Sequence, residues 1–156
     1  MKTTTKLIVA GLLTTLFTTN MSANQIYNPE KIFLKKCQMC HALTKPQNKQ
    51  EKMRMAAPPI AIAMRSVVIG VDAIEDPADE KELRKMSIAF LEDYLMSPSQ
   101  DKGYCEDMSY KKFGTMPSLK GFITPEQISI VVPWVYENFA PQKDENGNYT
   151  VHSKRK

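Results

Sequence analysis

The chain has 156 residues, with 21 lysines and arginines against 17 aspartates and glutamates, a formal net charge of +4. A chain of this length forms one domain around one hydrophobic core. The net charge falls to about +2 once Lys2 and Lys6 are discounted as part of a removable leader, and so small an excess argues against nucleic acid as a partner.

Residues 1–23 have the pattern of a secretory signal peptide. Lys2 and Lys6 precede an apolar stretch over residues 7–17, and small and polar residues follow as far as Ala23. The apolar stretch is shorter than the ~20 residues that cross a membrane, although retention of the segment as an anchor stays open. We therefore expect a protein exported to the periplasm, with residues 24–140 as its folded domain and no transmembrane segment in the mature chain.

The first predicted helix follows this leader. Asn28 suits the N-cap, and Pro29 suits the first helical position, where the missing N–H costs nothing. The helix is expected to run through Lys36. Phe33 stands four residues before Cys37, so both face the same side of the helix, and we expect Phe33 to pack in the core.

The sequence Cys37-Gln38-Met39-Cys40-His41 ends this helix and is the pattern that attaches a c-type haem. Two cysteines three residues apart lie on one side of a helical turn, so both thiols can add to the vinyl groups along one edge of the porphyrin. The adjacent imidazole then reaches the iron. The sequence therefore predicts one covalent haem c on Cys37 and Cys40, with His41 as the proximal iron ligand.

Two other interpretations of this motif need parts that the chain lacks. A thioredoxin-like redox site needs a strand before the C-x-x-C motif and a βαβ pattern around it, and a zinc site needs a second pair of ligands. The remaining cysteine is Cys105 and the remaining histidine is His152, in a polar tail. Haem attachment needs only the pentapeptide itself, so it is the interpretation that the sequence favours.

The helix and its motif resemble the class I cytochromes c. That family also has an amphipathic helix with an aromatic residue four positions before the first cysteine. It usually has a glycine eight positions before that cysteine, where the last helix crosses closely, whereas this chain has Pro29. The resemblance implies an all-α cytochrome c fold, with helices wrapped around one covalently attached haem.

A polar stretch over residues 42–54 follows and is expected to form an irregular loop. Pro58 and Pro59 come next, before a helix predicted over residues 60–71. These prolines could simply form a turn. The family resembled uses the carbonyl of a proline here to accept the Nδ1–H of the histidine ligand, and either Pro58 or Pro59 could take this role.

A longer amphipathic helix is predicted from Asp76 to Ser97. The Asp76-Pro77 pair repeats the cap-and-proline start of the first helix. A short amphipathic turn is predicted over residues 106–113.

Met116-Pro117 then provides a candidate distal ligand, because thioether sulfur is a soft ligand for iron and Pro117 favours an extended backbone at Met116. The family resembled places its distal methionine before a proline, ahead of the last helix. Met108 is the second candidate.

The last predicted helix has a well-formed start. Thr124 caps it, Pro125 takes the first position and Gln127 completes a capping box. Trp134 and Tyr136 flank its apolar stripe, and we expect an aromatic from this helix to pack on the first helix. Residues 141–156 are polar and are expected to be a disordered basic tail. The resemblance to class I cytochromes c thus covers the first helix with its motif, the methionine loop and the last helix.

These features predict a soluble one-electron carrier. Histidine and methionine ligands would fill both axial positions of the iron and leave no place for a substrate. A haem enzyme, a gas-binding sensor with a displaceable distal ligand, and a haem subunit of a larger redox complex remain as alternatives. A single C-x-x-C-H motif argues against a dihaem peroxidase.

Four lysines and the third cysteine complete the set of candidate residues. Lys35, Lys36, Lys111 and Lys112 would flank the haem edge and steer an acidic redox partner, or else belong to an ordinary solvated surface. Cys105 would be a buried inert thiol, or would form a disulfide-linked dimer or a regulatory thiol. The expected state of the protein is a monomer.

Overall fold

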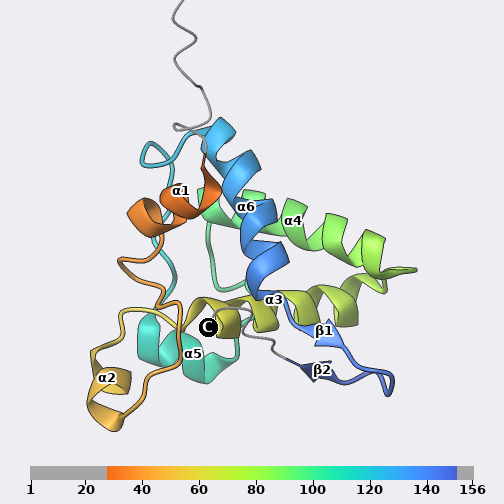
Figure 1. Ribbon diagram of the computed structural model, residues 1–156, viewed down its shortest axis with the longest axis horizontal. Helices are drawn as coiled ribbons and strands as arrows, with labels where there is room; N and C mark the ends of the chain where they lie inside the picture. The colour runs from red at the N-terminus through yellow and green to blue at the C-terminus, as the bar shows by residue number, and fades with distance from the viewer. Residues whose placement is uncertain (1–27, 151–156) are drawn as a thin grey trace, which may run out of the picture.

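The computed structural model describes residues 28–150. Helices dominate this part of the chain, as the predicted all-α class requires, and one small hairpin is added (Figure 1). The elements in chain order are α1 (Pro29–Lys36), α2 (Lys49–Arg54), α3 (Ile60–Glu75), α4 (Glu80–Met96), α5 (Asp107–Phe113), α6 (Pro125–Phe139), β1 (Gln142–Lys143) and β2 (Tyr149–Thr150).

The predicted caps of the first and last helices are confirmed. The side chain of Asn28 accepts a hydrogen bond from the Lys31 amide at 2.9 Å, and Pro29 occupies the first turn of α1. At the start of α6, the Thr124 hydroxyl accepts from the Gln127 amide at 3.3 Å, and the Gln127 side chain accepts from the Thr124 amide at 3.2 Å. Both starts rest on contacts within four residues, which explains why the sequence predicts them.

The packing of α1 on α6 is built around Phe33, as expected. Phe33 is fully buried, and the centre of its ring lies 5.6 Å from that of Trp134 and 5.8 Å from that of Phe139. The predicted aromatic contact between the first and last helices is therefore present, and it comes from Trp134 and Phe139. This contact fixes the direction in which the chain leaves α1.

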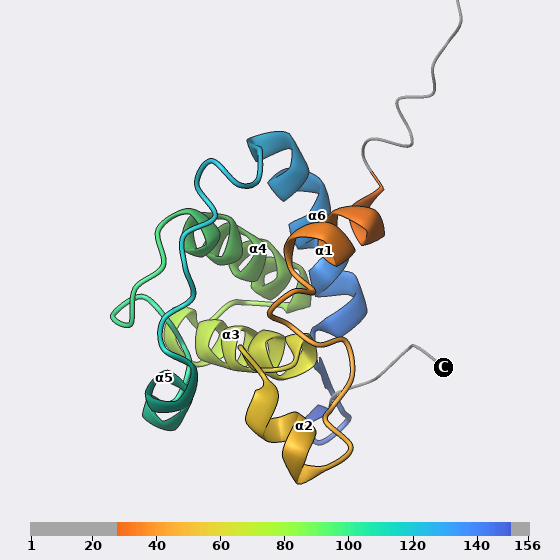
Figure 2. The same cartoon turned by 90° about the vertical axis from the view of Figure 1, so that its left-hand side faces the viewer.

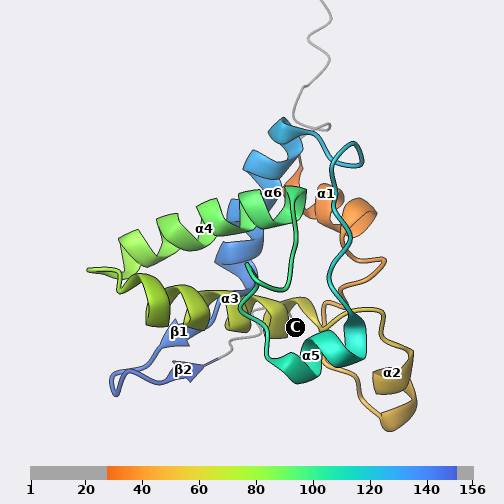
Figure 3. The ribbon, with the colours of Figure 1, turned by 180° about the vertical axis from the view of Figure 1, so that it is seen from behind.

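Helices α3 and α4 form a hairpin that α6 crosses, and both contact α6 (Figures 1 and 3). An ion pair between Arg84 and Glu137, 2.7 Å apart, adds a surface link between α4 and α6. The core residues that these helices share are mostly aliphatic: Ile60, Met64, Val68, Val71, Leu83, Ile128, Val131, Val132 and Val135. Because α6 touches α1, α3 and α4, it holds these three helices in one arrangement.

The expectation of an irregular loop over residues 42–54 is wrong at its end, where α2 forms. The Asn48 side chain accepts from the Glu51 amide at 2.9 Å, and the Glu51 carboxylate accepts from the Gln47 amide at 2.7 Å. This reciprocal capping stabilises a single short helix that has no buried residue. A search for apolar periodicity cannot find such a helix.

The longest helix also begins later than predicted. Asp76 ends α3 in the left-handed region with a φ of 46°, so α3 extends beyond the predicted residue 71 and Asp76 does not cap α4. Asp79 is the cap instead, and its carboxylate accepts from the Glu82 amide at 2.8 Å. The sequence offers both aspartates, and Asp79 has a glutamate three residues later that completes the cap.

The expectation of a disordered tail over residues 141–156 is wrong for residues 141–150. Strands β1 and β2 pair antiparallel, with Lys143 opposite Tyr149. The Asp144 side chain accepts from the amides of Asn146 and Asn148, at 2.9 Å each, and stabilises the turn between them. Lys143 Nζ lies 2.8 Å from the Asp72 carboxylate, which fastens the hairpin to α3.

The predicted signal peptide, residues 1–23, lies outside the described residues, as does the end of the tail after residue 150. Among residues 28–150, no helix combines the length and the apolar character that crossing a membrane would need.

We predict that Phe33→Ala lowers the free energy of unfolding by ~3–5 kcal/mol, because it removes a fully buried ring between α1 and α6. Leu34→Ala is the matched control, since Leu34 is 41% exposed on the same helix and its loss should cost less than about 1 kcal/mol. Urea unfolding followed by circular dichroism measures both. Equal losses in the two variants would contradict the role assigned to Phe33.

Candidate functional site

A cavity of about 420 Å³ lies among α1, α3, α4, α5 and the segment that joins α5 to α6. Its lining is mainly apolar, and its volume lies in the range of sites that hold small molecules and cofactors. In Figure 2, the chain that follows α1 and the chain that follows α5 run on opposite sides of α3. The predicted site residues come from these two segments, which are called the histidine wall and the methionine wall below, and both segments line the cavity.

The first wall carries the two motif cysteines and His41. Cys37 is the C-cap of α1, and the chain continues for one more turn, in which the His41 amide donates to the Cys37 carbonyl at 2.9 Å. Cys37, Cys40 and His41 all line the cavity. The structure therefore brings the predicted thiols and imidazole to one wall.

His41 is held by the carbonyl of a proline. Its Nδ1–H donates to Pro58 O at 2.9 Å, so of the two predicted prolines it is Pro58 that contacts the ring. Pro59 is the buried N-cap residue of α3, where its carbonyl accepts from the amides of the first helical turn. With Nδ1 occupied, Nε2 is the ring nitrogen left for a metal.

The electrostatics of this wall favour uncharged groups. Burial lowers the pKa of His41 below its ordinary value, and the bond to Pro58 opposes this shift only in part. Burial also raises the pKa of the Cys37 thiol to about 11, with a smaller contribution from Cys40. A neutral imidazole is the form that binds a metal, so the wall is suited to coordination.

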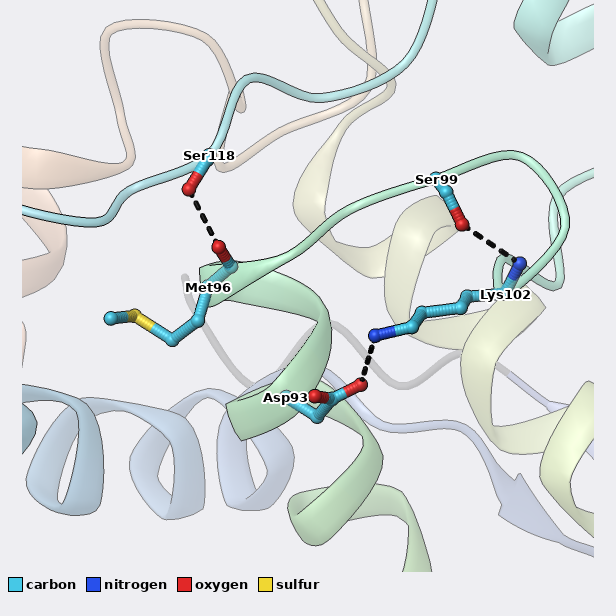
Figure 4. Close-up of polar contacts among 5 residues, drawn as sticks. All are labelled: Asp93, Met96, Ser99, Lys102 and Ser118. Atoms are coloured by element: carbon cyan, nitrogen blue, oxygen red, sulfur yellow. Dashed lines mark hydrogen bonds and ion pairs between the residues drawn. The ribbon is translucent and has the colours of Figure 1, made fainter.

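Met116 belongs to the methionine wall and lines the same cavity. The segment before it begins at Gly114, which ends α5 with a φ of 71° that glycine adopts without strain. The segment after it is fixed to the end of α4. The Ser118 hydroxyl donates to Met96 O at 2.6 Å, and the Leu119 amide donates to Leu95 O at 2.9 Å (Figures 3 and 4).

Met108 does not occupy a comparable position. It is on α5, 70% of its surface is exposed, and it lies outside the lining of the cavity. Of the two methionines that the sequence offers as distal ligands, the structure therefore brings Met116 to the cavity and leaves Met108 at the surface.

Three tyrosines that line the cavity were not among the predicted site residues. The cavity is lined by Tyr94 of α4, by Tyr104 in the loop before α5, and by Tyr110 of α5. Tyr94 lies within the amphipathic helix predicted up to Ser97, and a phenol ring occupies the apolar stripe of such a helix as readily as any other aromatic. No sequence pattern relates these tyrosines to one another, since tertiary packing brings them together.

Cys105 lines the cavity as well, half-buried beside these tyrosines. Burial raises the pKa of its thiol, and a hydrogen bond with Ser66 opposes that shift. All three cysteines of the chain are free thiols. The structure thus places Cys105 at the site itself.

The four predicted docking lysines fall into two groups at the ends of α1 and α5. Lys36 Nζ donates to Phe122 O at 2.5 Å and lies 4.0 Å from the centre of the Phe122 ring, while Lys35 is exposed. Lys112 Nζ donates to Lys52 O at 3.2 Å, and Lys111 is exposed. Lys112 also lines a shallow groove between α2 and α5 together with Lys49, Lys52 and Met53.

Within residues 28–150, no three histidine, cysteine, aspartate or glutamate side chains gather in a way that would hold a metal ion by themselves. The candidate iron ligands, His41 and Met116, are a different set. They come from the two different walls of the cavity.

We predict that Ser118→Ala loosens the Met116 segment, because it removes the 2.6 Å bond to the Met96 carbonyl. A hydrogen bond of this kind contributes ~1 kcal/mol, so the Leu119 amide should exchange its hydrogen roughly five times faster. Ser99→Ala is the control, since Ser99 makes a 3.3 Å bond within the neighbouring loop (Figure 4). Unchanged exchange at Leu119 in Ser118→Ala would mean that this bond does not restrain the segment.

Comparison with known proteins adds one relative. No family model matches the chain, and no solved structure matches it. An uncharacterized protein of Aquifex aeolicus is 28% identical over 124 residues, which cover 74% of this chain and 76% of that protein. The chain is thus similar to an uncharacterized protein over about three quarters of each chain.

Proposed function

We propose that this protein is an exported one-electron carrier of the class I cytochrome c type, with one covalently attached haem c. The observation that carries the proposal is the cavity, whose lining includes Cys37, Cys40, His41 and Met116. These are the residues that the sequence motif and the resemblance predict. They are separated by up to 79 positions in the chain, yet they line one space.

The residues present fit such a group. The thiols of Cys37 and Cys40 would form the two thioether bonds, because they lie on the turn that directly follows α1. His41 Nε2 would bind the iron from this wall, with its other nitrogen already engaged by Pro58 O. Met116 Sδ would bind it from the other wall. When bound, the haem would supply an iron that accepts and releases one electron.

Electron transfer suits this site better than catalysis on a substrate. A ligand on each face of the iron leaves no open coordination position, and the mainly apolar lining keeps water away and favours the ferrous state. A haem enzyme, a gas sensor and a haem subunit of a larger redox complex stay as alternatives, and the ligation state of the iron separates the first two from a carrier.

The cytochrome c fold and the periplasmic location belong to the same proposal. The contact of α1 with α6 through Phe33 and Trp134 supports it, because the family resembled pairs its first and last helices. The leader at residues 1–23 supports export, since haem c is attached outside the bacterial inner membrane. We propose a monomer.

We predict that Met116→Ala keeps the haem covalently attached and opens the iron on the Met116 side. The ferric sulfur-to-iron absorption band should disappear, and the ferrous protein should bind carbon monoxide, which the parent should refuse. Met108→Ala is the matched control, because Met108 is 70% exposed on α5, and it should keep the parent spectrum. Absorption spectra with and without carbon monoxide measure both variants.

A Met116→Ala protein that kept the sulfur-to-iron band would require another sulfur ligand, and Cys105 would be examined first because it lines the same cavity. A protein that acquired no covalent haem in a host able to attach it would contradict the proposal as a whole.

We further propose that lysines at the ends of α1 and α5 guide an acidic redox partner to the exposed edge of the haem. Lys36 and Phe113 line the cavity. Lys112 directly precedes Phe113 in the chain, and its Nζ lies 4.5 Å from the centre of the Phe113 ring. Positive charge at two sides of the cavity would raise the rate of encounter with an acidic surface, in a small and transient contact. The alternative is an ordinary solvated surface.

We predict that replacing Lys35, Lys36, Lys111 and Lys112 by glutamine slows oxidation by the anion hexacyanoferrate at least about threefold at low salt, with a weaker dependence on ionic strength. Lys81→Gln with Lys85→Gln on α4 is the control, because these lysines are exposed and lie outside the cavity lining. Stopped-flow rates across salt concentrations measure the effect. Identical salt dependence in the fourfold variant and the control would assign these lysines to the solvated surface.

A further inference from the structure

Two of the four lysines considered for docking are held by contacts with distant segments. Lys36, at the end of α1, is half-buried, whereas its neighbour Lys35 is exposed. Lys36 Nζ donates to Phe122 O at 2.5 Å, across 86 positions of the chain, and lies 4.0 Å from the centre of the Phe122 ring. A cation with both a carbonyl acceptor and an aromatic face beside it has a defined place in the structure.

The turn that accepts the Lys36 bond is itself firmly held. The amides of Phe122 and Ile123 donate to Leu119 O at 2.9 and 3.1 Å, and Ile123 is buried in the core. Leu119 is in turn bonded to the end of α4. This turn belongs to the chain that follows α5, and Lys36 and Phe122 both line the cavity. Lys36 therefore joins the end of α1 to a firm part of the methionine wall.

Lys112 makes a corresponding contact in the other direction. It is on α5, and its Nζ donates to Lys52 O at 3.2 Å. Lys52 is in the last turn of α2, where backbone carbonyls have no partner within the helix, so a cation there is favourable. Helix α2 lies beside α5 (Figure 3) and belongs to the chain between His41 and Pro58. Because α2 has no buried residue, core packing does not fix it, and the contact with Lys112 does.

The two lysines therefore bridge the wall segments at two places. Lys36 reaches from the start of the histidine wall to the chain after Met116, and Lys112 reaches from α5 to the chain after His41. Such bridges restrict how far the segments can separate and how much water can enter between them. Access of water to a redox iron favours the more highly charged ferric state, so closed walls favour the ferrous state.

We propose that Lys36 and Lys112 are positioning residues, which hold the histidine wall and the methionine wall together and thereby raise the reduction potential of the bound haem. The inference rests on the proposed attachment of haem c, and it gives these lysines a task apart from guiding a partner. The charge of a lysine would also raise the potential. Salt screens that effect, whereas it leaves a hydrogen bond to a neutral carbonyl in place.

The test is the ratio of reduced to oxidised haem-loaded protein at a fixed solution potential, in about 1 M salt, where the screening length is ~3 Å. Lys36→Leu and Lys112→Leu should each lower this ratio at least about threefold, and the double variant about ninefold, because separate contacts add. Lys31→Leu on α1 and Lys49→Leu on α2 are the matched controls. They should keep the parent ratio, because these lysines are exposed and lie outside the cavity lining.

A conservative variant and a second measurement separate the possible results. Lys36→Arg keeps a cationic donor and should keep the parent ratio. A fall in the ratio that appears only at low salt would mean that the lysines act by charge alone. A lower free energy of unfolding with an unchanged ratio would make the contacts purely structural. Either result would overturn the inference, whereas a parent without covalent haem, detected by its pyridine haemochrome spectrum, would contradict the proposed function.

Discussion

The burial of Phe33 between α1 and α6 is the constraint on which the site depends. The ring is fully buried and contacts Trp134 and Phe139, so α1 has one favourable orientation on α6. The turn that carries Cys37, Cys40 and His41 follows α1 without a linker, and its position is thus set by the same contact. A change in the packing of α1 would move the thiols and the imidazole together.

The methionine wall is fixed by a different set of contacts, which also lead back to α6. Met116 is positioned by backbone and hydroxyl bonds from Ser118 and Leu119 to the end of α4. Helix α4 in turn packs on α6 and pairs with it through Arg84 and Glu137. One helix therefore determines the distance between two walls that are far apart in the chain. A fixed distance is what an iron with two protein ligands needs, because both bonds must form at once.

The polar groups that line the cavity find their partners in different ways. The Nδ1 donor of His41 has its acceptor in Pro58 O, and burial lowers the pKa of the imidazole. The Tyr94 and Tyr110 hydroxyls lie together beside Gly103, and burial together with the bond between the two phenols raises the pKa of Tyr94. A cavity whose polar groups find partners in the protein leaves its apolar surface as the main feature that a bound group would contact.

The sequence by itself determined the features that depend on neighbouring residues. The caps at Asn28 and Thr124, the side of α1 that Phe33 shares with Cys37, and the pairing of Met116 with Pro117 each follow from contacts or restrictions within four positions. The Asp79 cap and the Asn48 cap are equally local. They were missed because Asp76-Pro77 offers a competing start, and because a short exposed helix has no apolar stripe to reveal it.

Only the tertiary structure decided which of several chemically equivalent residues belong to the site. Pro58 rather than Pro59 accepts from His41, and Met116 rather than Met108 lines the cavity, because the packing of α3 and the bonds at the end of α4 select them. The hairpin over residues 142–150 forms where a polar tail was expected, since Lys143 finds Asp72 on α3. The convergence of Tyr94 and Tyr110 at Gly103 has no sequence signal at all. Contacts between distant segments depend on how whole helices pack, and no local pattern of residues encodes that arrangement.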